Sequence, residues 1–551
     1  MIIRINKFFK SIYLRSLIKK KFNYIFKKKI NSKNIILVEF NKWSVLNITI
    51  AYLANILSRD VDAKIYAYSE NLFNDLLNKK SFFKRALFFI GEKFNLGSFG
   101  IYRAFGTERF IKLNNINPDL IIKSKKKLKS LLKKNITRKY ILNLRLENIQ
   151  VGHLFYDTYL KHYKCETIEP TDKNFIYFLE KSILNFYFWY DYISKNRVLG
   201  VICSQPVYNS SIPARIAADL NIKCLIANPH YLFSLSKKKK FYRRHSLDYK
   251  KYFNELNSYQ KKIALNLTKK MLDKYFLGKI SLPEKMTYLS HSTYKKFKAS
   301  KRNKFNSDKI KVLICSHAFS DAPHSLGHHF YEDYYQWLIS ILNLSKKLDY
   351  EWYLKLHPEN VYLFDNAHKI IKDLIQRKFA NVNIIEPDCS HHRVMQKNID
   401  FVLTCNGSVA SEYPYFGIPS INASLANPHV DFRFSITPKN KIEYINLLSN
   451  LKKIRSNFKI NRREIVIFFL MHNFYYSPTW FIFNWERVYK FCKKKNFIYR
   501  EIFFDYWLKS FSFNSHRSIM QNLKNFIRSK DYLFNFKHEK ISFEDHIKRF
   551  I

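Results

Sequence analysis

Short apolar runs alternate with stretches of helical spacing along most of this chain. Near the start, KNIILVEF (33–40) is a continuous apolar run typical of a buried strand, and VLNITIAYLANILS (45–58) has the spacing of a helix. AKIYAYS (63–69) predicts the next strand. Strand, helix and strand in this order predict a right-handed crossover between parallel strands. The same pattern returns in RVLGVICSQ (197–205), SIPARIAADLN (211–221) and KCLIANP (223–229).

A second unit of the same kind is predicted after residue 310. Its expected helices lie near 331–347, 362–378 and 409–416. Its expected strands are KVLICSH (311–317), WYLKLHP (352–358), NVNIIEP (381–387), DFVLTCNGS (400–408) and IPSINAS (418–424).

The remaining segments separate these units or follow them. We expect an α/β protein with two Rossmann-like, doubly wound domains and a helical, basic C-terminal extension rich in aromatic residues. A single large Rossmann-like domain with insertions is the alternative. The predicted divisions are a basic leader (1–32), the first Rossmann-like domain (33–235), a helical basic connection (236–309), the second Rossmann-like domain (310–440) and the extension (441–551).

Composition changes this picture in two ways. The formal net charge of +53 is typical of proteins that bind nucleic acid or membrane surfaces, but Lys, Asn, Ile, Phe and Tyr are all frequent together, as an AT-rich genome produces. The seven cysteines are scattered without a CxxC pair, which favours a reducing cytosol and argues against a zinc site. The leader has cations in every apolar stretch, so it predicts neither a signal peptide nor a spanning helix.

Polar, turn-forming residues follow the predicted strands of the second unit. In a parallel open sheet, ligands bind beyond the carboxyl ends of the strands, so these residues are candidates for a binding site. The groups are Ser316-His317, His357-Pro358, Glu386-Pro387-Asp388 and Asn406-Gly407-Ser408.

The segment TCNGSVASEYPYFGIPS (404–420) is the most informative of them. Gly407 allows a tight turn after the strand, and Ser408 is in position to cap the next helix. The N-terminus of that helix would suit a phosphate, and Glu412 one turn later would reach ribose hydroxyls. An ordinary strand, turn and capped helix is the alternative.

These residues resemble a known family. Lys355-x-His357-Pro358 after one strand, followed about fifty residues later by a small-residue turn, Ser408-x-x-x-Glu412 and GIP, is similar to the nucleotide-sugar half of GT-B glycosyltransferases. The similarity covers about 310–425 and is to enzymes of bacterial capsule and surface-polysaccharide synthesis, including Kdo and sialic-acid transferases. It implies that residues 33–235 bind the acceptor and that the later domain binds the donor.

The resemblance also implies roles for single residues. His357 would contact the donor phosphate and act in catalysis, with Asn406, Gly407 and Ser408 around the same phosphate and Glu412 on the ribose. His317, Lys355 and Pro358 complete the expected donor site. Some relatives have paired Ser or Thr where this chain has Asn406-Gly407-Ser408, which leaves the donor open.

A general base for the acceptor is expected in the first half of the chain. In VGHLFYDTYLKHY (151–163), His153 and Asp157 share one face of a predicted helix, and Asp157 is our candidate for the base. Glu39 is the second choice. A surface or capping aspartate is the alternative.

Metal ligation is not expected. RDVDAK (59–64) contains a DxD, but it precedes a strand and therefore lies at the wrong edge of the sheet. The histidines of SHAFSDAPHSLGHH (316–329) fit no standard zinc spacing and favour a loop in the cleft.

The sequence therefore predicts a metal-independent glycosyltransferase with no cofactor beyond its nucleotide-sugar donor. The expected partners are a polysaccharide or lipid-linked acceptor and an anionic membrane surface, in a cytoplasmic protein peripheral on the inner membrane. A sugar-nucleotide 2-epimerase or a polyol-phosphate transferase is the alternative. Binding to nucleic acid is not expected, because the basic residues run through the whole chain and no nucleic-acid-binding motif is present.

Overall fold

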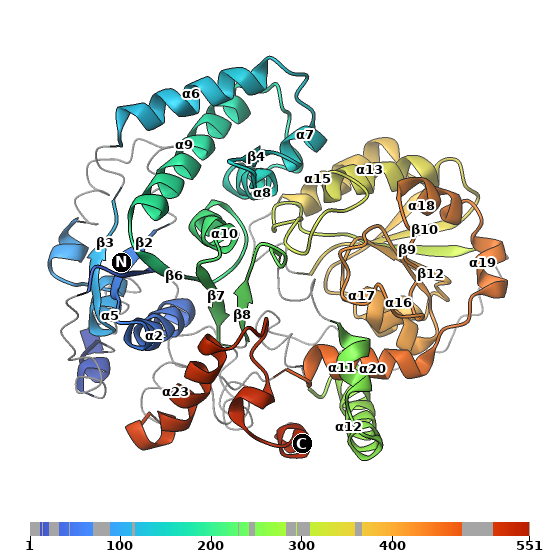
Figure 1. The fold of residues 1–551 in the computed structure, drawn as a ribbon. Helices are drawn as coiled ribbons and strands as arrows, with labels where there is room; N and C mark the ends of the chain where they lie inside the picture. The colour runs from blue at the N-terminus through green and yellow to red at the C-terminus, as the bar shows by residue number, and fades with distance from the viewer. Residues whose placement is uncertain are drawn as a thin grey trace.

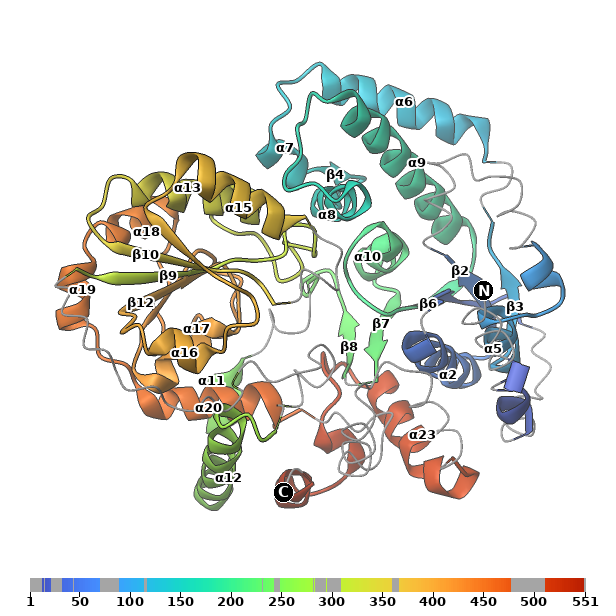
Figure 2. The ribbon, with the colours of Figure 1, turned by 180° about the vertical axis from the view of Figure 1, so that it is seen from behind.

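The structure, a computed structural model, describes residues 12–13, 15–20, 32–42, 44–69, 89–112, 116–229, 231–241, 248–280, 282, 294, 309–358, 366–476 and 511–549. Most of the predicted leader lies outside these residues. So do large parts of the predicted connection and of the C-terminal extension, including 295–308 and 477–510. Two open β-sheets organise the described chain, seen on opposite sides of the molecule in Figure 1 and from behind in Figure 2.

The first sheet belongs to residues 32–241, which we call the first unit. Its strand order is β3-β2-β1-β6-β7-β8, and every pair is parallel except β7 with β8. The four strands predicted in this unit are confirmed; the polar edge strand β3 and the antiparallel β8 were not predicted. The strands are β1 (Ile35–Glu39), β2 (Lys64–Tyr68), β3 (Thr107–Phe110), β6 (Val198–Cys203), β7 (Lys223–Asn228) and β8 (Tyr231–Leu235).

The second sheet belongs to residues 309–458, the second unit. All its pairs are parallel, and its order β11-β10-β9-β12-β13 is that of a doubly wound fold. The direction of winding reverses between β9 and β12, the point where such sheets bind ligands. The five predicted strands are confirmed as β9 (Lys311–Cys315), β10 (Glu351–Lys355), β11 (Val382–Ile385), β12 (Phe401–Thr404) and β13 (Ser420–Asn422).

Helices cover both faces of the first sheet. On one face lie α2 and α5, and on the other lie α8, α9 and α10, with α6 outside α9 (Figure 1). The long α9 begins at Asp172, whose side chain accepts hydrogen bonds from two backbone N–H groups of the first turn. The helices are α2 (Ser44–Asp60), α5 (Ser98–Ala104), α6 (Pro118–Leu132), α7 (Arg138–Leu142), α8 (Gly152–Tyr163), α9 (Lys173–Lys195) and α10 (Ile212–Asp219), with a hairpin of β4 (Arg145–Leu146) and β5 (Ile149–Gln150) between α7 and α8 and a short 3-10 turn, η1 (Asn209–Ser211), before α10.

In the second unit and the connection before it, the predicted helices are also present. The helix expected near 362–378 is seen from Ala367, and the one near 409–416 divides into a short α-helix and a 3-10 turn. They are α11 (Tyr249–Asn254), α12 (Ser258–Phe276), α13 (Tyr334–Ser345), α15 (Ala367–Lys378), α16 (His391–Met395), α17 (Val409–Glu412), η4 (Tyr413–Phe416), α18 (Lys441–Leu448) and α19 (Leu451–Asn457).

The C-terminal region packs on both units. The helix α20 (Arg462–Asn473) contacts α11, α12 and η4, whereas α23 (Phe513–Arg528) packs on α2 of the first unit. Leu533 forms a β-bridge with Phe233 of β8, just before η5 (Phe536–Glu539) and the last helix α24 (Phe543–Lys548). The α/β class with parallel, Rossmann-like sheets is therefore confirmed, while the exact division into domains stays a prediction.

A loop of the second unit, residues 316–333, joins the two units. Asp333 is fully buried at its end, where one carboxylate oxygen caps α13 through the Gln336 N–H. The other oxygen accepts hydrogen bonds from Tyr156 Oη at 2.5 Å and Thr167 Oγ1 at 2.6 Å, both in the first unit. Because the carboxylate is satisfied from both units, this contact holds them together. Within the described residues, no helix is long and apolar enough to cross a membrane.

Candidate functional site

A cavity of about 430 Å³ opens at the carboxyl ends of β9, β10 and β12. Eight of the nine residues proposed from the sequence line it: His317, Lys355, His357, Pro358, Asn406, Gly407, Ser408 and Glu412. Gln205, Val207 and Tyr208, which follow β6 of the first unit, form part of the opposite wall. The cavity therefore lies at the switch point of the second sheet and is closed by residues of the first.

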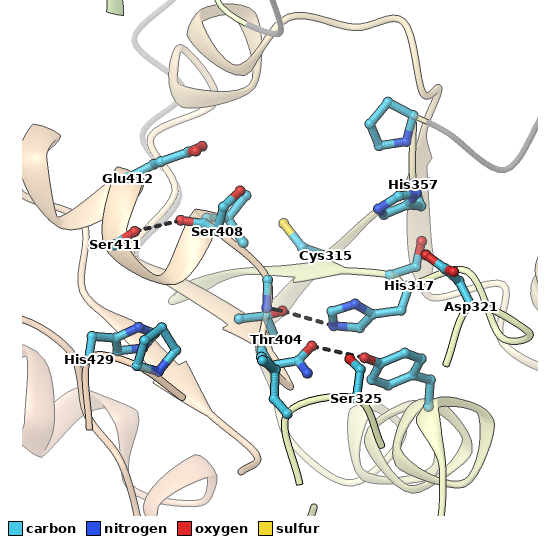
Figure 3. A pocket seen from close by; sticks show the side chains of 18 of the residues that line it. Cys315, His317, Asp321, Ser325, His357, Thr404, Ser408, Ser411, Glu412 and His429 are labelled. Carbon is cyan, nitrogen blue, oxygen red and sulfur yellow. Dashed lines mark hydrogen bonds between the residues drawn. The ribbon is translucent and has the colours of Figure 1, made fainter. Parts of the chain in front are cut away.

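His357 and Pro358 follow the end of β10 at one end of the cavity. The Leu356 N–H donates a hydrogen bond to the Ile385 carbonyl at 3.0 Å, which extends the pairing of β10 with β11. The His357 carbonyl accepts from His368 Nε2 at 2.8 Å. The backbone of His357 is thus fixed on both sides, while its side chain remains half-buried at the cavity wall. Figure 3 shows His357 at the opposite end of the cavity from Glu412 and His429.

His317, after β9, has a defined tautomer. Its Nε2 accepts from the Cys405 N–H at 3.3 Å and lies 3.0 Å from Thr404 Oγ1, which itself accepts from the Gly407 N–H at 3.1 Å. An Nε2 that accepts carries no proton, so the proton of this neutral ring is on Nδ1. Burial, aided by the charge of nearby His357, holds the pKa of His317 well below its ordinary value. His317 is therefore a neutral hydrogen-bond donor at the cavity wall.

The turn Asn406-Gly407-Ser408 packs closely against this pair. A Cβ added to Gly407 would lie 2.7 Å from Thr404 Oγ1, so glycine is needed for close approach and not for a left-handed backbone. The predicted capping by Ser408 is wrong: its backbone is already helical and its side chain makes no capping hydrogen bond. Asn406 Oδ1 accepts from the Tyr334 hydroxyl at 3.0 Å, and the Tyr334 ring stacks on His317.

Gly407→Ala is expected to lower the free energy of unfolding by about 1–3 kcal/mol, the usual cost of an added methyl group in a tightly packed position. The methyl group would displace the Thr404 hydroxyl and with it the contact to His317. Thr404→Val removes the hydroxyl without crowding, so comparing the two variants by chemical denaturation separates crowding from the lost hydrogen bonds. An unchanged unfolding midpoint in both would contradict the role given to this turn.

Lys355 and Glu412 reach the cavity wall with polar groups that are already engaged. Lys355 Nζ donates to the carbonyls of Glu386 and Pro387, both at 3.2 Å, and burial lowers the pKa of its ammonium group. The buried carboxylate of Glu412 accepts from Tyr275 Oη at 3.1 Å and Tyr294 Oη at 2.8 Å. Their donor-binding roles stay predictions.

Asp157 and His153 do share one face of α8, as predicted, but they are not among the residues that line the cavity in the described chain. The buried Asp157 carboxylate lies 2.6 Å from His324 Nδ1 and accepts from the His324 N–H at 3.2 Å. Burial raises the pKa of Asp157. Burial also opposes protonation of His324, but the charge and hydrogen bond of Asp157, together with the Glu332 carbonyl and Asp333, outweigh it and raise the pKa of His324. The base role of Asp157 stays a prediction, and this geometry favours a structural role instead.

Tyr208 and Asp321 are among the lining residues that sequence reasoning did not propose. Tyr208 is buried with φ 62° and ψ 177°, a backbone conformation that costs energy for any residue with a side chain. Its hydroxyl donates to Asp321 Oδ1 at 3.4 Å across the junction of the units. Asp321 itself is exposed and lies at the same end of the cavity as His357 (Figure 3). Tyr208 follows the end of β6, so the strand-end argument applied to the first unit would have found it.

The far end of the cavity is built by segments that the sequence did not connect with the site. Pro428 and the buried His429 come from the loop after β13, and Phe468, Phe469, His472 and Asn473 come from α20. Burial lowers the pKa of His429 to about 3, so its ring is neutral. Across the described part of the chain, no group of three or more His, Cys, Asp or Glu side chains is arranged to hold a metal ion.

Glu39, the second candidate for the base, ends β1 next to β6. Its carboxylate accepts from the Ser204 N–H at 2.6 Å and from the Ser204 hydroxyl at 2.8 Å, and Asn41 Nδ2 donates to it at 3.1 Å. Glu39 is buried and is not among the described residues that line the cavity. It fixes the carboxyl ends of two adjacent strands.

No protein-family model matches this chain, and no curated protein matches it significantly. Among solved structures, the chain is 13% identical to the KpsC beta Kdo 2,4 transferase of Thermosulfurimonas dismutans, with 50% of this chain and 79% of that one covered and a TM-score of 0.31. It is 12% identical to the UDP-GlcNAc 2-epimerase of Neisseria meningitidis, over 80% of this chain and 97% of that one, with a TM-score of 0.24.

A glycosyltransferase of Rickettsia africae is likewise 12% identical, over 87% of this chain and all of that one, with a TM-score of 0.23. At these identities and TM-scores, the likeness carries no conclusion about what this chain binds or does. The assignment of the fold rests on the strand order and register of the two sheets.

Proposed function

We propose that this protein is a glycosyltransferase that transfers a sugar from a nucleotide-sugar to a polysaccharide or lipid-linked acceptor. The observation that carries the proposal is the cavity between the units, which His317, His357 and the turn at Asn406–Ser408 line together at the switch point of a parallel sheet. Its volume of about 430 Å³ lies within the range of small-molecule sites. The motif resemblance around His357 and Ser408 supports a nucleotide-sugar as the ligand.

In the proposed reaction, the donor phosphates lie against His317, His357 and the turn at Asn406–Ser408. Glycosyl transfer leaves negative charge on the departing phosphate, and donors held in place before the reaction stabilise it. The neutral His317 ring, which carries its proton on Nδ1, is held by Thr404 and Cys405 and needs no rearrangement for this task. The half-buried His357 provides the second ring at the same wall.

We assign the acceptor base to Asp321. Two carboxylates, those of Asp321 and Glu412, line the cavity among the described residues. Glu412 is buried and accepts from two buried tyrosines, whereas Asp321 is exposed and accepts from Tyr208 at 3.4 Å. The exposed Asp321 would take the proton from the acceptor hydroxyl while that oxygen bonds to the anomeric carbon. The bond from the anomeric carbon to the phosphate oxygen breaks, and the nucleotide leaves with the electron pair.

The location of the reaction is part of the proposal. A surface polysaccharide or its lipid-linked precursor, extended at the cytoplasmic face of the inner membrane, fits the motif resemblance and the net charge of +53.

The test is nucleotide binding by wild type and by His357→Ala. One of CMP, UDP, GDP or CDP, free or linked to a sugar, is expected to bind wild type, and His357→Ala is expected to weaken it by about 10- to 100-fold, the range for a lost hydrogen bond to a charged group. Isothermal calorimetry measures the affinity, and thermal unfolding checks the fold.

His162→Ala is the matched control, since His162 lies at the end of α8 and not at the cavity. If none of these nucleotides bound wild type, or if both histidine variants lost affinity equally, the donor site would be refuted. Conversion of the bound donor to its C2 epimer without transfer would favour the epimerase alternative.

A further inference from the structure

One stretch of the first unit is strongly basic. From Leu120 to Leu146 the sequence has ten Lys or Arg and no Asp or Glu. Since 43 of the 551 residues are acidic, a stretch of this length would carry roughly two of them by composition alone. The stretch is therefore more basic than the average composition of the chain. Most of it forms α6, with α7 and β4 after it.

The helix α6 separates its residues onto two faces. Ser124, Leu128 and Leu131 are buried against α9, and the other side faces away from the molecule at its outer edge (Figure 1). Steps of three and four residues put one exposed set on a single stripe of that outer side. The stripe consists of Ile122, Lys125, Lys126, Lys129, Leu132 and, directly after the helix, Lys133.

This stripe combines lysines with exposed aliphatic side chains. Ile122 is 51% exposed and Leu132 is 42% exposed, although both are large and apolar. Within the part of the chain that the structure describes, none of the four stripe lysines forms a salt bridge, whereas the neighbouring Lys123 pairs with Glu147. A solvated lysine face has no need of exposed Ile and Leu, but a helix lying at a lipid interface uses both.

We propose that the α6 stripe docks this protein on an anionic lipid bilayer. The lysines would meet the phosphate groups of the lipids, and Ile122 and Leu132 would enter the boundary of the acyl chains. Each lysine near an anionic bilayer contributes about fivefold to binding, so the four together contribute several hundredfold. This docking does not depend on the proposed activity.

The position of the stripe also suits that activity. The basic stretch ends at the hairpin of β4 and β5, where Gln150 Nε2 lies 2.9 Å from His328 Nε2 of the loop that joins the units. If the proposed function holds, an acceptor carried by a lipid would approach the cleft along this side of the first unit.

The test uses the full chain and vesicles of phosphatidylcholine with or without phosphatidylglycerol. Wild type is expected to sediment with the anionic vesicles and not with pure phosphatidylcholine. The variant K125E/K126E/K129E/K133E is expected to bind the anionic vesicles at least 100-fold more weakly. Ile122→Ser with Leu132→Ser should weaken binding several-fold with no change in charge.

The matched control reverses four exposed lysines of α12 instead: Lys262, Lys269, Lys270 and Lys274. This variant has the same net charge as the α6 variant and is expected to keep most of the binding. Equal loss in both variants would overturn the proposal in favour of general charge attraction. Equal binding of wild type to neutral and to anionic vesicles would also overturn it. So would a soluble acidic polysaccharide that binds α6 more tightly and releases the protein from anionic vesicles. Thermal unfolding of each variant detects a folding defect. Nucleotide binding tests the proposed function separately, so neither failure is mistaken for a docking defect.

Discussion

Asp321→Asn is expected to slow release of nucleotide from the bound nucleotide-sugar by about 100-fold or more, the range for removal of a general base. The asparagine keeps the size and polarity of the side chain but cannot take the proton of the acceptor. Nucleotide affinity should change little, because the proposed phosphate contacts come from His317, His357 and the turn at 406–408. The measurement is the rate of nucleotide release with each sugar-nucleotide found to bind, with acceptor or with water in its place.

Two further variants make this result specific. Asp191→Asn breaks only an exposed pair with Lys195 on α9 and should leave the rate unchanged. Asp157→Asn should lower stability, since it removes a buried carboxylate from His324, without the same loss of rate in the folded fraction. If Asp321→Asn released nucleotide at the normal rate and a well-folded Asp157→Asn did not, Asp157 would be the base.

The sheets were predictable because their strands are short, continuous apolar runs. Each of the nine strands predicted from such runs is present, including β12, whose four residues are all buried. The edge strand β3 was not predictable in this way, since the exposed Glu108 and Arg109 interrupt its pattern. Local hydrophobicity thus predicts the strands that are short apolar runs, including the edge strands β11 and β13, and misses β3, whose two central residues are exposed.

The donor side of the site followed from one topological rule, but the acceptor side did not. His317, His357 and Asn406 reach the cavity because the carboxyl ends of parallel strands share one edge of a sheet. The loop at 316–333 crosses to the first unit through contacts 166 to 178 residues apart in sequence, such as Thr167 with Asp333 and Gln150 with His328. No local pattern encodes such contacts, so the partner of Asp157 was not predictable.

The helical spacing of His153 and Asp157 shows the same limit. Both lie on one buried face of α8, as the spacing predicts. Periodicity does not predict the partners of that face. In the structure, Arg215 Nη2 lies 3.2 Å from His153 Nε2, and His324 lies next to Asp157. A pair of polar residues on one helix face is therefore a weak guide to catalysis when the loop that covers it is unknown.

Acid is expected to unfold this protein well above the pH at which its carboxylates titrate. His153, His317, His429 and His546 are buried, and burial holds the pKa of each below the ordinary value, to about 3 for His429 and about 4 for His546. In the unfolded chain all four titrate near 6.5. Below that pH the unfolded state binds more protons than the folded state, so the free energy of unfolding falls as the pH falls.

The expected size of this effect is about 5 kcal/mol between pH 7.5 and 5.5 for the four rings together, a large part of the usual 5–15 kcal/mol of a folded protein. His324 acts in the opposite direction: its raised pKa adds stability below about 6.5 and loses it as the pH rises through the folded-state pKa. Its contribution is complete once the pH is below about 6.5, so it offsets only a fixed part of a loss that the other four rings continue to increase.

Substitution of one of these rings tests the account directly. His429 packs between Phe434 and Phe468, and its buried Nε2 has no hydrogen-bond partner among the residues that the structure describes, so His429→Phe should fold with little cost at neutral pH. Chemical denaturation across pH 5 to 8 should then show a slope shallower by about 1.4 kcal/mol per pH unit on the acid side, the contribution of one histidine. Phe434→Leu changes the packing beside His429 without removing a titratable group and should leave the slope unchanged. An acid slope identical in wild type and His429→Phe would mean that His429 binds its proton as readily in the folded protein as in the unfolded chain, which would contradict the effect assigned to its burial.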